Sequence, residues 1–306
     1  MERKNKLKVI LLILICNILW GSLFPCVKLG YEAFCIDGSN VFQIMTFAGA
    51  RFVISGLIIT ALGLFKKEPL PIGKNKGLPA ILLSGLFAII LHYTCTYVGL
   101  TMTDSSKTAL LKQLATLLYI CFGFLFMKDE TFGVGKIAGG LIGFAGIALI
   151  NTGSGSLQLG LGDWLIIAAS VFSVVSNLTI KQALKKSTPI MSTGVSHFFG
   201  GVVMLIIGLA FGGSIAFTAQ SLPIFTYICV ASIVSYCLWN YALKQAELSK
   251  MFIIKFTEPL FACIFGWLLL GENIFKWEYL GAFVLICGGI CLGNMSFKKR
   301  IKEETK

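Results

Sequence analysis

Residues 249–272 have the sequence S-K-M-F-I-I-K-F-T-E-P-L-F-A-C-I-F-G-W-L-L-L-G-E, an apolar run long enough to cross a lipid bilayer. Lys255, Glu258 and Pro259 lie inside this run. A charge in the hydrocarbon costs at least about 2.5 to 3.5 kcal/mol on insertion scales, so ionisable residues there usually face protein or a water-filled path. We therefore expect this segment to line a polar space.

The spacing of the three polar positions supports that expectation. Lys255 and Glu258 share one helix face, where each can neutralise the other. Pro259 removes a backbone hydrogen bond in the same turn, and the freed carbonyl needs protein or cavity water as a partner. Two alternatives stay open: the pair only joins two helices, or Lys255 extends to the near membrane interface.

The composition indicates an integral membrane protein. Of 306 residues 56% are hydrophobic and 13% charged, and the mean hydropathy is +0.85, which excludes an ordinary soluble globular protein. The net charge of +12 lies mostly in short loops between apolar blocks, which favours a bilayer partner over a nucleic acid. The ten cysteines form no C-x-x-C pair, so neither a disulfide framework nor a metal site is implied.

Apolar blocks of spanning length predict an all-α fold with ten transmembrane helices. The first block follows a basic N-terminus but has no small-residue cleavage site, so we interpret it as an uncleaved span. The predicted spans are 9–30, 41–65, 78–101, 106–127, 134–152, 162–184, 189–211, 222–245, 250–271 and 276–297.

The distribution of basic residues predicts the orientation. With the N-terminus inside, that side holds most of the lysines, and the opposite side has little beyond Lys28, Lys107 and Lys276. Because cytoplasmic loops carry the excess of Lys and Arg, we expect a multi-pass protein of the cell membrane with both termini in the cytoplasm. The loop 31–40 is then outside.

The two halves of the chain resemble each other. An offset of 143 (250 − 107) pairs Ser106-Lys107 with Ser249-Lys250, Tyr93 with Tyr236 and Lys112 with Lys255. An offset of 146 also pairs Arg51-Phe52 with His197-Phe198. We predict two repeats, 1–153 and 154–306, each with an odd number of spans and therefore inverted in the membrane. Inverted repeats are a transporter architecture, with the substrate site between the halves.

Three segments carry a family resemblance. They are W-G-S-x-x-P-x-x-K (Trp20 to Lys28), Arg51-Phe52, and the E-P-L-F-A-C-I-F-G-W-L-L-L-G-E that begins at Glu258. With these segments the whole chain resembles the EamA-type drug/metabolite transporters. The resemblance implies ten helices in two inverted EamA repeats, and export or exchange of small metabolites without a tightly bound cofactor. The sequence departs from the family pattern at Ala115-Thr116, where a proline is expected, and at Lys112 and Lys255.

The two intramembrane lysines are candidate substrate ligands. Each lies about five residues, or roughly 7.5 Å of helix, inside its predicted span. Because the spans run in opposite directions, Lys112 and Lys255 are expected to flank the midplane about 15 Å apart in depth. A small anion between them could pass from one lysine to the other. Lys112 has no carboxylate one turn away, so it could instead extend to the interface.

Aromatic and polar residues within the spans complete the predicted site. Arg51 is expected near the membrane centre, and the aromatic residues share helix faces, although they could equally be packing or interfacial residues. The full predicted substrate site comprises Lys112, Lys255, Glu258, Trp20, Tyr93, Tyr97, Tyr236, Trp239, Asn240 and Arg51.

The sequence predicts a transporter rather than an enzyme. There is no G-x-x-x-x-G-K phosphate loop, and the two histidines, His92 and His197, do not accompany a recognisable nucleophile. We expect a secondary transporter of an amino acid or related organic acid. The alternatives are an exporter of cationic drug-like compounds, with Glu258 as counter-charge, and a receptor or enzyme that transports nothing.

Small residues spaced four apart predict close helix packing in spans five and ten. They are Gly139, Gly143 and Gly146 in span five and Gly289 and Gly293 in span ten, and they could form a homodimer interface.

Overall fold

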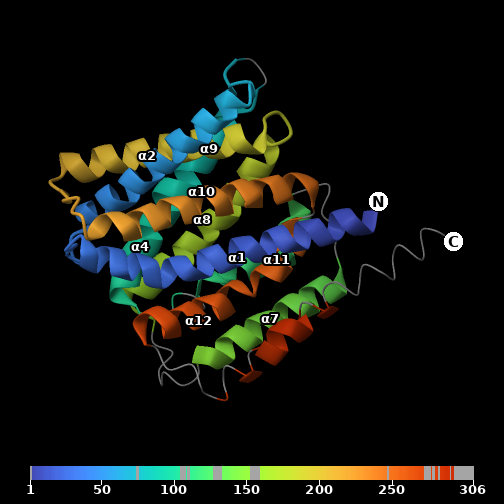
Figure 1. Cartoon of the computed structure of the whole chain (residues 1–306). Coiled ribbons are helices and arrows are strands. Elements are labelled where there is room, and N and C mark those ends of the chain that lie inside the picture. Colours follow the sequence, from blue (N-terminus) through green and yellow to red (C-terminus); the bar gives the residue numbers. More distant parts are fainter. Residues whose placement is uncertain are drawn as a thin grey trace.

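The computed structural model is a bundle of helices over the part of the chain that it describes (Figure 1). The described residues are 2–73, 76–103, 108, 111–126, 133–151, 159–246, 248–271, 277, 280–281, 283–289 and 291–292. The elements are α1 (Glu2–Ala33), α2 (Val41–Phe65), α3 (Leu78–Gly85), η1 (Leu86–Leu91), α4 (His92–Met102), α6 (Leu114–Phe122), η2 (Gly123–Leu125), α7 (Val134–Asn151), α8 (Leu161–Ala183), α9 (Pro189–Ala210), α10 (Ser221–Gln245), α11 (Leu248–Lys255) and α12 (Glu258–Leu270).

Among the described residues, seven helical segments are long and apolar enough to cross a membrane. They are Leu7–Ala33, Val41–Phe65, Leu78–Met102, Leu161–Ala183, Pro189–Ala210, Ser221–Gln245 and Met251–Leu270. Leu114–Leu125 and Val134–Gly146 are shorter apolar helices within predicted spans four and five. Much of the predicted tenth span lies outside the described residues, and residues 283–289 within it are helical.

The outer surface of the bundle is apolar, and polar groups lie inside. Leu57, Leu62 and Ile206 are large side chains about half exposed on the outer faces of α2 and α9, whereas Arg51 and Glu258 are buried. This is the arrangement expected when lipid replaces water around a helical bundle. The described residues are therefore those of a multi-pass membrane protein.

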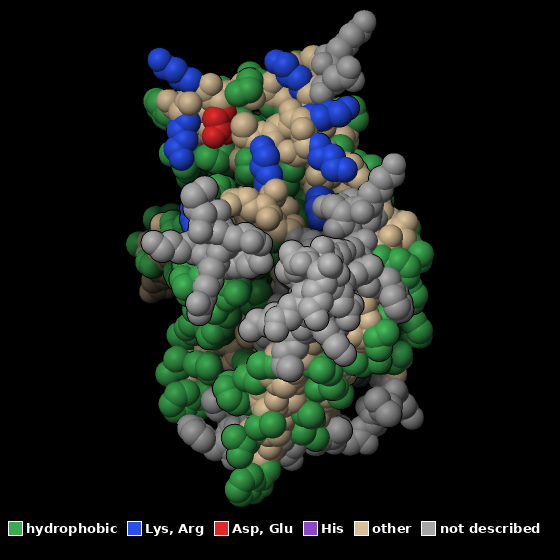
Figure 2. All heavy atoms as spheres, turned by 90° about the vertical axis from the view of Figure 1, so that its right-hand side faces the viewer, with side chains coloured by type: hydrophobic (Ala, Val, Ile, Leu, Met, Phe, Trp, Pro, Cys, Tyr) green, Lys and Arg blue, Asp and Glu red, His purple; other side chains and the backbone are tan. Residues whose placement is uncertain are grey.

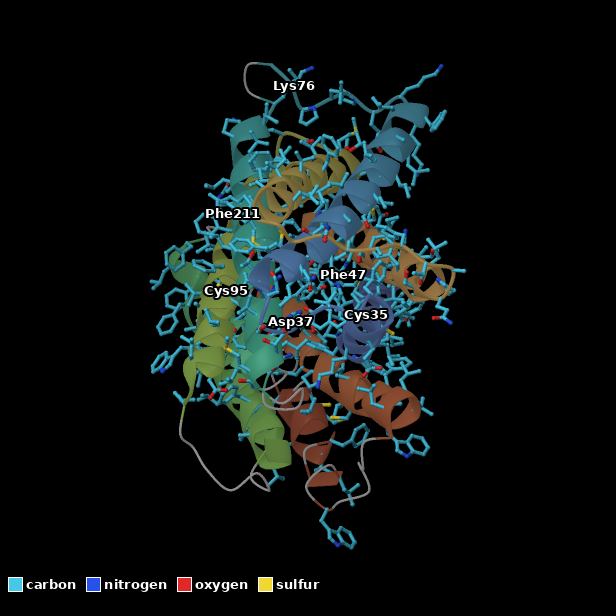
Figure 3. The ribbon with its side chains drawn as sticks, turned by 90° about the vertical axis from the view of Figure 1, so that its left-hand side faces the viewer. Cys35, Asp37, Phe47, Lys76, Cys95 and Phe211 are labelled. Carbon is cyan, nitrogen blue, oxygen red and sulfur yellow. The ribbon has the colours of Figure 1, made fainter. Side chains whose placement is uncertain are left out.

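The exposed lysines gather at one end of the bundle, where α1 begins and α2 and α10 end (Figure 2). Figure 3 looks at the other end and labels Cys35 and Asp37 in the loop between α1 and α2. The described exposed lysines at the first end are Lys8, Lys66, Lys67, Lys76, Lys185, Lys186 and Lys244.

Helices α2 and α9 pack closely through glycines. A Cβ added at Gly49 would lie 2.5 Å from the Leu205 nitrogen, and one at Gly201 would lie 2.5 Å from the Val53 nitrogen, so the two backbones touch. In both pairs the residue numbers sum to 254, which makes the helices antiparallel. The glycines at this interface that repeat with an offset of 145 are Gly49 and Gly194, Gly56 and Gly201, and Gly63 and Gly208. This register is one residue shorter than the predicted 146, so it aligns Phe52 rather than Arg51 with His197.

The helix is interrupted beside Pro259, within the span that the sequence predicts as continuous from 250 to 271. α11 ends at Lys255 and α12 begins at Glu258, with a turn at residues 256–257. A second break lies in predicted span four, where Lys112 is helical, Gln113 is a turn residue and α6 begins at the next residue. Both breaks directly follow the lysines that the offset of 143 pairs. The second break has no proline, so proline alone does not explain it.

Candidate functional site

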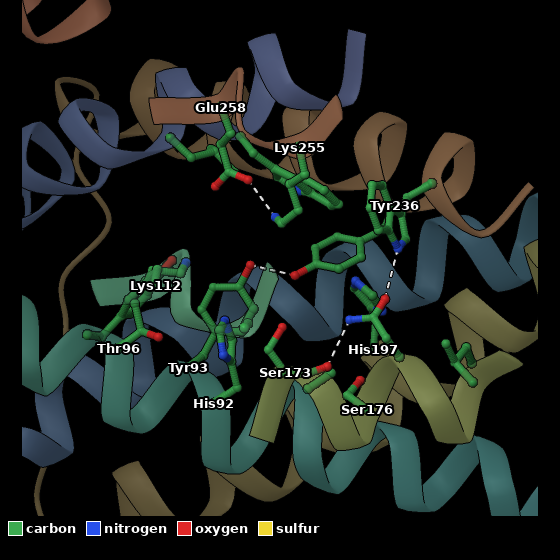
Figure 4. Close-up of a pocket in the computed structure, with 18 of the residues that line it drawn as sticks. His92, Tyr93, Thr96, Lys112, Ser173, Ser176, His197, Tyr236, Lys255 and Glu258 are labelled. Carbon is green, nitrogen blue, oxygen red and sulfur yellow. Dashed lines mark hydrogen bonds and ion pairs between the residues drawn. The ribbon is translucent and has the colours of Figure 1, made fainter. Parts of the chain in front are cut away.

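A cavity of about 110 Å³ lies in the interior of the bundle, and its lining includes all ten predicted site residues. The ten predicted residues come from α1, α2, α4, α10, both sides of the α11–α12 break and the segment before α6, and α3, η1, α6, α8 and α9 add further lining residues. Figure 4 shows the cavity with the side chains of Lys112, Tyr93, Tyr236, Lys255 and Glu258 around it. The prediction that these residues lie together is consistent with this geometry, and their role in binding stays a prediction.

Lys255 and Glu258 form an ion pair across the helix break. The Lys255 Nζ lies 2.5 Å from Glu258 Oε2, and the Glu258 side chain is 4% exposed. Lys255 is the last residue of α11 and Glu258 the first of α12. A cation is stabilised at a helix C-terminus and an anion at a helix N-terminus, so the break favours both charges in addition to their mutual attraction. The interruption explains how a charge pair is held at this depth.

Asn17 holds the broken helix against α1. Its Nδ2 donates to the Ile254 carbonyl at 3.0 Å and to Thr257 Oγ1 at 2.9 Å. Thr257 Oγ1 also donates to the Ile254 carbonyl at 3.0 Å. These bonds satisfy backbone that a membrane helix would otherwise satisfy internally. Asn17 was not among the predicted residues, although an asparagine in an apolar run is the signal that could have found it.

Two indole rings surround the Lys255 ammonium. Its Nζ lies 4.4 Å from the ring centroid of Trp20 and 5.7 Å from that of Trp239. The two rings are 5.0 Å apart, and Tyr236 packs edge-on against Trp20 at 5.4 Å. A cation over an aromatic face is attracted by the ring quadrupole, so Glu258 and the rings form a site for a positive charge. We call Glu258, Trp20 and Trp239 the cation box.

Arg51 is fully buried on α2 and has no carboxylate partner among the described residues. Its Nε donates to Ser232 Oγ at 2.9 Å and its Nη1 to the Tyr97 hydroxyl, while Nη2 has no hydrogen-bond partner. The guanidinium also lies 4.7 Å from the ring centroid of Phe52 and 5.3 Å from that of Tyr93. A buried cation with a free donor is poised for an anion.

Lys112 is the third cation at the cavity. Its Nζ lies 4.9 Å from the ring centroid of Phe24, and no ion pair of Lys112 is found among the described residues. Figure 4 labels it beside Thr96, apart from the Lys255–Glu258 pair. The described lining of the cavity thus carries three basic side chains and one carboxylate.

The remaining predicted residues connect helices around the cavity. The Tyr93 and Tyr236 hydroxyls are 2.6 Å apart, so the two tyrosines paired by the offset of 143 meet each other. The Trp239 Nε1 donates to Asn177 Oδ1 at 3.0 Å, and the Asn240 Nδ2 donates to Thr193 Oγ1 at 2.7 Å. Asn240 is therefore held by α9, and its amide joins two helices as well as lining the cavity.

The structure adds polar residues that sequence analysis did not include in the site. His197 lies against the Tyr236 ring at 4.4 Å, and its Nε2 has no partner. The His92 Nδ1 donates to the Ala169 carbonyl at 2.8 Å. The polar residues that also line the cavity are Ser84, His92, Thr96, Gln113, Ser173, Ser176, Asn177, Ser196 and His197.

The comparison with protein families decides the identity of this bundle. The model of the EamA-like transporter family matches residues 7–152 and 160–294. This chain belongs to the EamA-like transporter family. The expected resemblance is confirmed, and the two matched segments correspond to the two halves of this EamA-like protein.

Relatives of known name are transporters or related proteins. The chain is 27% identical over 288 residues to a WAT1-related chloroplastic protein of Arabidopsis thaliana, covering 87% of this chain and 65% of that protein. It is 23% identical to the uncharacterized transporter YdfC of Bacillus subtilis, covering 93% and 90%. It is 24% identical to an S-adenosylmethionine/S-adenosylhomocysteine transporter of Chlamydia muridarum, covering 86% and 85%.

A solved crystal structure shares the fold of this EamA-like protein. The two superpose with a TM-score of 0.74 over 96% of this chain and 98% of the other, at 16% sequence identity. At that identity the likeness concerns the fold alone. The family and the named relatives establish a transporter in general terms and leave its substrate class open.

Proposed function

We propose that this protein is a secondary transporter that moves a small organic acid, such as an amino acid, across the cell membrane by alternating access to the cavity. The observation that carries the proposal is the charge of the described lining, in which Arg51, Lys112 and Lys255 face a single carboxylate, Glu258. In a low-dielectric interior this excess of positive charge favours a guest with a carboxylate or phosphate. The aromatic side chains of the lining favour an apolar body on the same guest.

The proposed architecture is two inverted five-helix repeats with ten spans, divided near residue 153. Three observations support it. Tyr93 and Tyr236 are related by the offset of 143 and contact each other, as expected for equivalent residues at a two-fold axis. The glycines of α2 and α9 repeat along two antiparallel helices. The breaks after Lys112 and Lys255 fall at equivalent positions, and broken helices beside the substrate are a feature of inverted-repeat transporters.

A homodimer through the glycines of spans five and ten stays a prediction. Gly289 lies against Gly139 and Gly143 of the same chain, where an added Cβ would be 2.5 Å from the Gly139 carbonyl oxygen. These glycines already allow close packing within one chain, so a dimer would have to use the outward sides of the same helices.

Transport into proteoliposomes tests the function. Vesicles holding purified protein and a high internal concentration of one unlabelled amino or organic acid should accumulate the same labelled acid by counterflow. We expect uptake above that of protein-free vesicles for at least one member of a panel of carboxylates and phosphates. Uptake of cations alone would favour the second candidate, an exporter of cationic compounds bound by the buried Glu258. Ligand binding without any uptake would contradict a transporter.

A further inference from the structure

The cation box is occupied by a part of the protein itself. The Lys255 ammonium meets the carboxylate of Glu258 at 2.5 Å and the faces of two indoles. A carboxylate with aromatic faces is the arrangement that recognises substituted ammonium ligands. Here a lysine side chain fills that position.

We propose that Lys255 is a tethered stand-in for the ammonium group of a zwitterionic substrate, which displaces Lys255 from the cation box when it binds. This inference deepens the proposed function and rests on it for the carboxylate end of the substrate. The displaced Lys255, together with Arg51 and Lys112, then faces the carboxylate of the substrate.

Charge balance supports an exchange of partners. The described lining holds three cations and one anion, and a simple cation would add to the positive excess. A zwitterion leaves the net charge unchanged and gives an opposite partner to a cation that has none. The Lys255–Glu258 pair is broken, but the ammonium of the substrate replaces Lys255 beside Glu258, and the carboxylate pairs with the lysine that is released. The number of ion pairs rises rather than falls.

Geometry allows Lys255 to leave. It is the last residue of α11, directly before the turn at residues 256–257, and its side chain is 17% exposed, whereas that of Glu258 is 4% exposed. The cavity of about 110 Å³ is smaller than the engineered cavity of about 150 Å³ that binds benzene. Withdrawal of the ammonium from beside the rings would give the space that a small substituted ammonium needs.

Binding to the wild-type protein in detergent tests the proposal without any variant. The probes are trimethylglycine and its carbon isostere 3,3-dimethylbutanoate, which has the same shape and carboxylate but no positive charge. Calorimetric titration should give a dissociation constant for trimethylglycine about tenfold or more below that of the isostere. Equal or tighter binding of the isostere would overturn the tethered-lysine proposal and leave the anion transporter standing. Binding of tetramethylammonium alone, with neither carboxylate bound, would instead contradict the proposed function.

Two matched variants test whether Lys255 competes with the ligand for the cation box or only repels it through its charge. Lys255→Met removes the tethered competitor, so tetramethylammonium should bind about tenfold or more tightly than to wild type. Lys112→Met removes the same charge from the same cavity but not from the cation box, so its gain should be clearly smaller. Equal gains in both variants would refute competition at the box. If Lys255→Met does not fold, the wild-type comparison of trimethylglycine with its isostere decides alone.

Discussion

Arg51 is held at the centre of the bundle by neutral groups. Its hydrogen-bond partners are Ser232 and Tyr97, and the faces of Phe52 and Tyr93 lie within 5.3 Å of the guanidinium. Moving an ion from water into a protein interior costs several kcal/mol, and hydrogen bonds to neutral partners offset only part of that cost. Because Arg51 is buried at this cost without a carboxylate partner in the described part of the chain, its charge favours a role in binding a ligand over a role in stability.

We therefore expect Arg51→Met to separate stability from function. Because Arg51 has no carboxylate partner among the described residues, Arg51→Met removes a desolvated charge and leaves no opposite charge unpaired, so the melting temperature should stay equal or rise. Affinity for an anionic substrate should fall about tenfold or more, because a charge-assisted hydrogen bond contributes about 1.5 to 3 kcal/mol. Thermal unfolding in detergent and substrate titration measure the two effects. Ser232→Ala is the control, since it removes one bond of Arg51 and leaves Nη2 free for the ligand. A large loss of melting temperature in Arg51→Met would assign Arg51 to the fold.

Individual side chains differ in how well the sequence predicts them. Lys255 and Glu258 were predictable because charges in an apolar run must find a partner or a cavity. Hydroxyl residues such as Ser173 carry no such signal, and amide residues such as Asn17 carry a weaker one. Their groups can bond a carbonyl of the same helix, as Ser232 does to Ile228 and Asn177 does to Ser173, so their presence does not tell which way they face.

At the scale of helices, the break between α11 and α12 depends on its neighbour α1. Asn17 of α1 bonds the Ile254 carbonyl and Thr257 Oγ1, and a Cβ at Gly21 would lie 2.7 Å from the Phe261 Cβ. α1 therefore fixes both sides of the break. Because Lys255 and Glu258 flank that break, the position of α1 also sets the geometry of the cation box.

Asn17→Leu should loosen this junction. The change removes both donors to the break and leaves the Ile254 carbonyl with fewer partners, at a cost of about 1 to 3 kcal/mol. Amide hydrogen exchange of the peptide covering 251–260 should become faster, while exchange in α9 stays the same. Thr257→Val is the matched control, because it keeps the bond from Asn17 to the Ile254 carbonyl and should have a smaller effect. Unchanged exchange around 251–260 in Asn17→Leu would show that Pro259 and packing hold the break without Asn17.

Helix interruptions were only partly predictable. Pro259 indicates the break between α11 and α12, because proline has no backbone N–H to donate and its ring clashes with the preceding turn. The break at Gln113 has no such residue, and neither does the π-helical stretch Leu86–Leu91 before His92. Both arise from packing in the folded bundle, which the apolar sequence around them does not encode. Span positions, in contrast, follow from hydropathy, and the predicted spans 41–65, 189–211 and 222–245 agree with α2, α9 and α10 within a residue.

For the whole molecule, the internal repeat was visible in the sequence because equivalent positions keep their residue types. The offset of 143 pairs Tyr93 with Tyr236, and the hydroxyls of these two tyrosines contact each other. The register of α2 against α9 needed the structure, because it depends on which glycines touch the opposite backbone. A two-residue match paired Arg51 with His197 in the repeat, whereas the offset of 145 between the glycines pairs Phe52 with His197, and the Phe52 and His197 rings lie 5.4 Å apart.

The orientation of the whole molecule gives the last prediction. Exposed lysines lie at the end where α1 begins, and Cys35 is exposed in the loop at the other end (Figures 2 and 3). Cytoplasmic loops carry the excess of basic residues, so the loop with Cys35 should face the outside. A maleimide that cannot cross the membrane should label Cys35 in intact cells, and Cys35→Ser should remove that label.

The control experiment places a thiol at the opposite end of the bundle. In the Cys35→Ser background, Lys186→Cys places a thiol on the exposed turn between α8 and α9, among the lysines. This thiol should react only after the membrane is permeabilised, because the excess of lysines predicts that the turn faces the cytoplasm. Labelling of Lys186→Cys in intact cells, with Cys35 protected until permeabilisation, would place the lysine-rich end outside. Since the membrane potential and the anionic leaflet both favour lysines on the cytoplasmic side, such a result would contradict the electrostatic basis of the assigned topology.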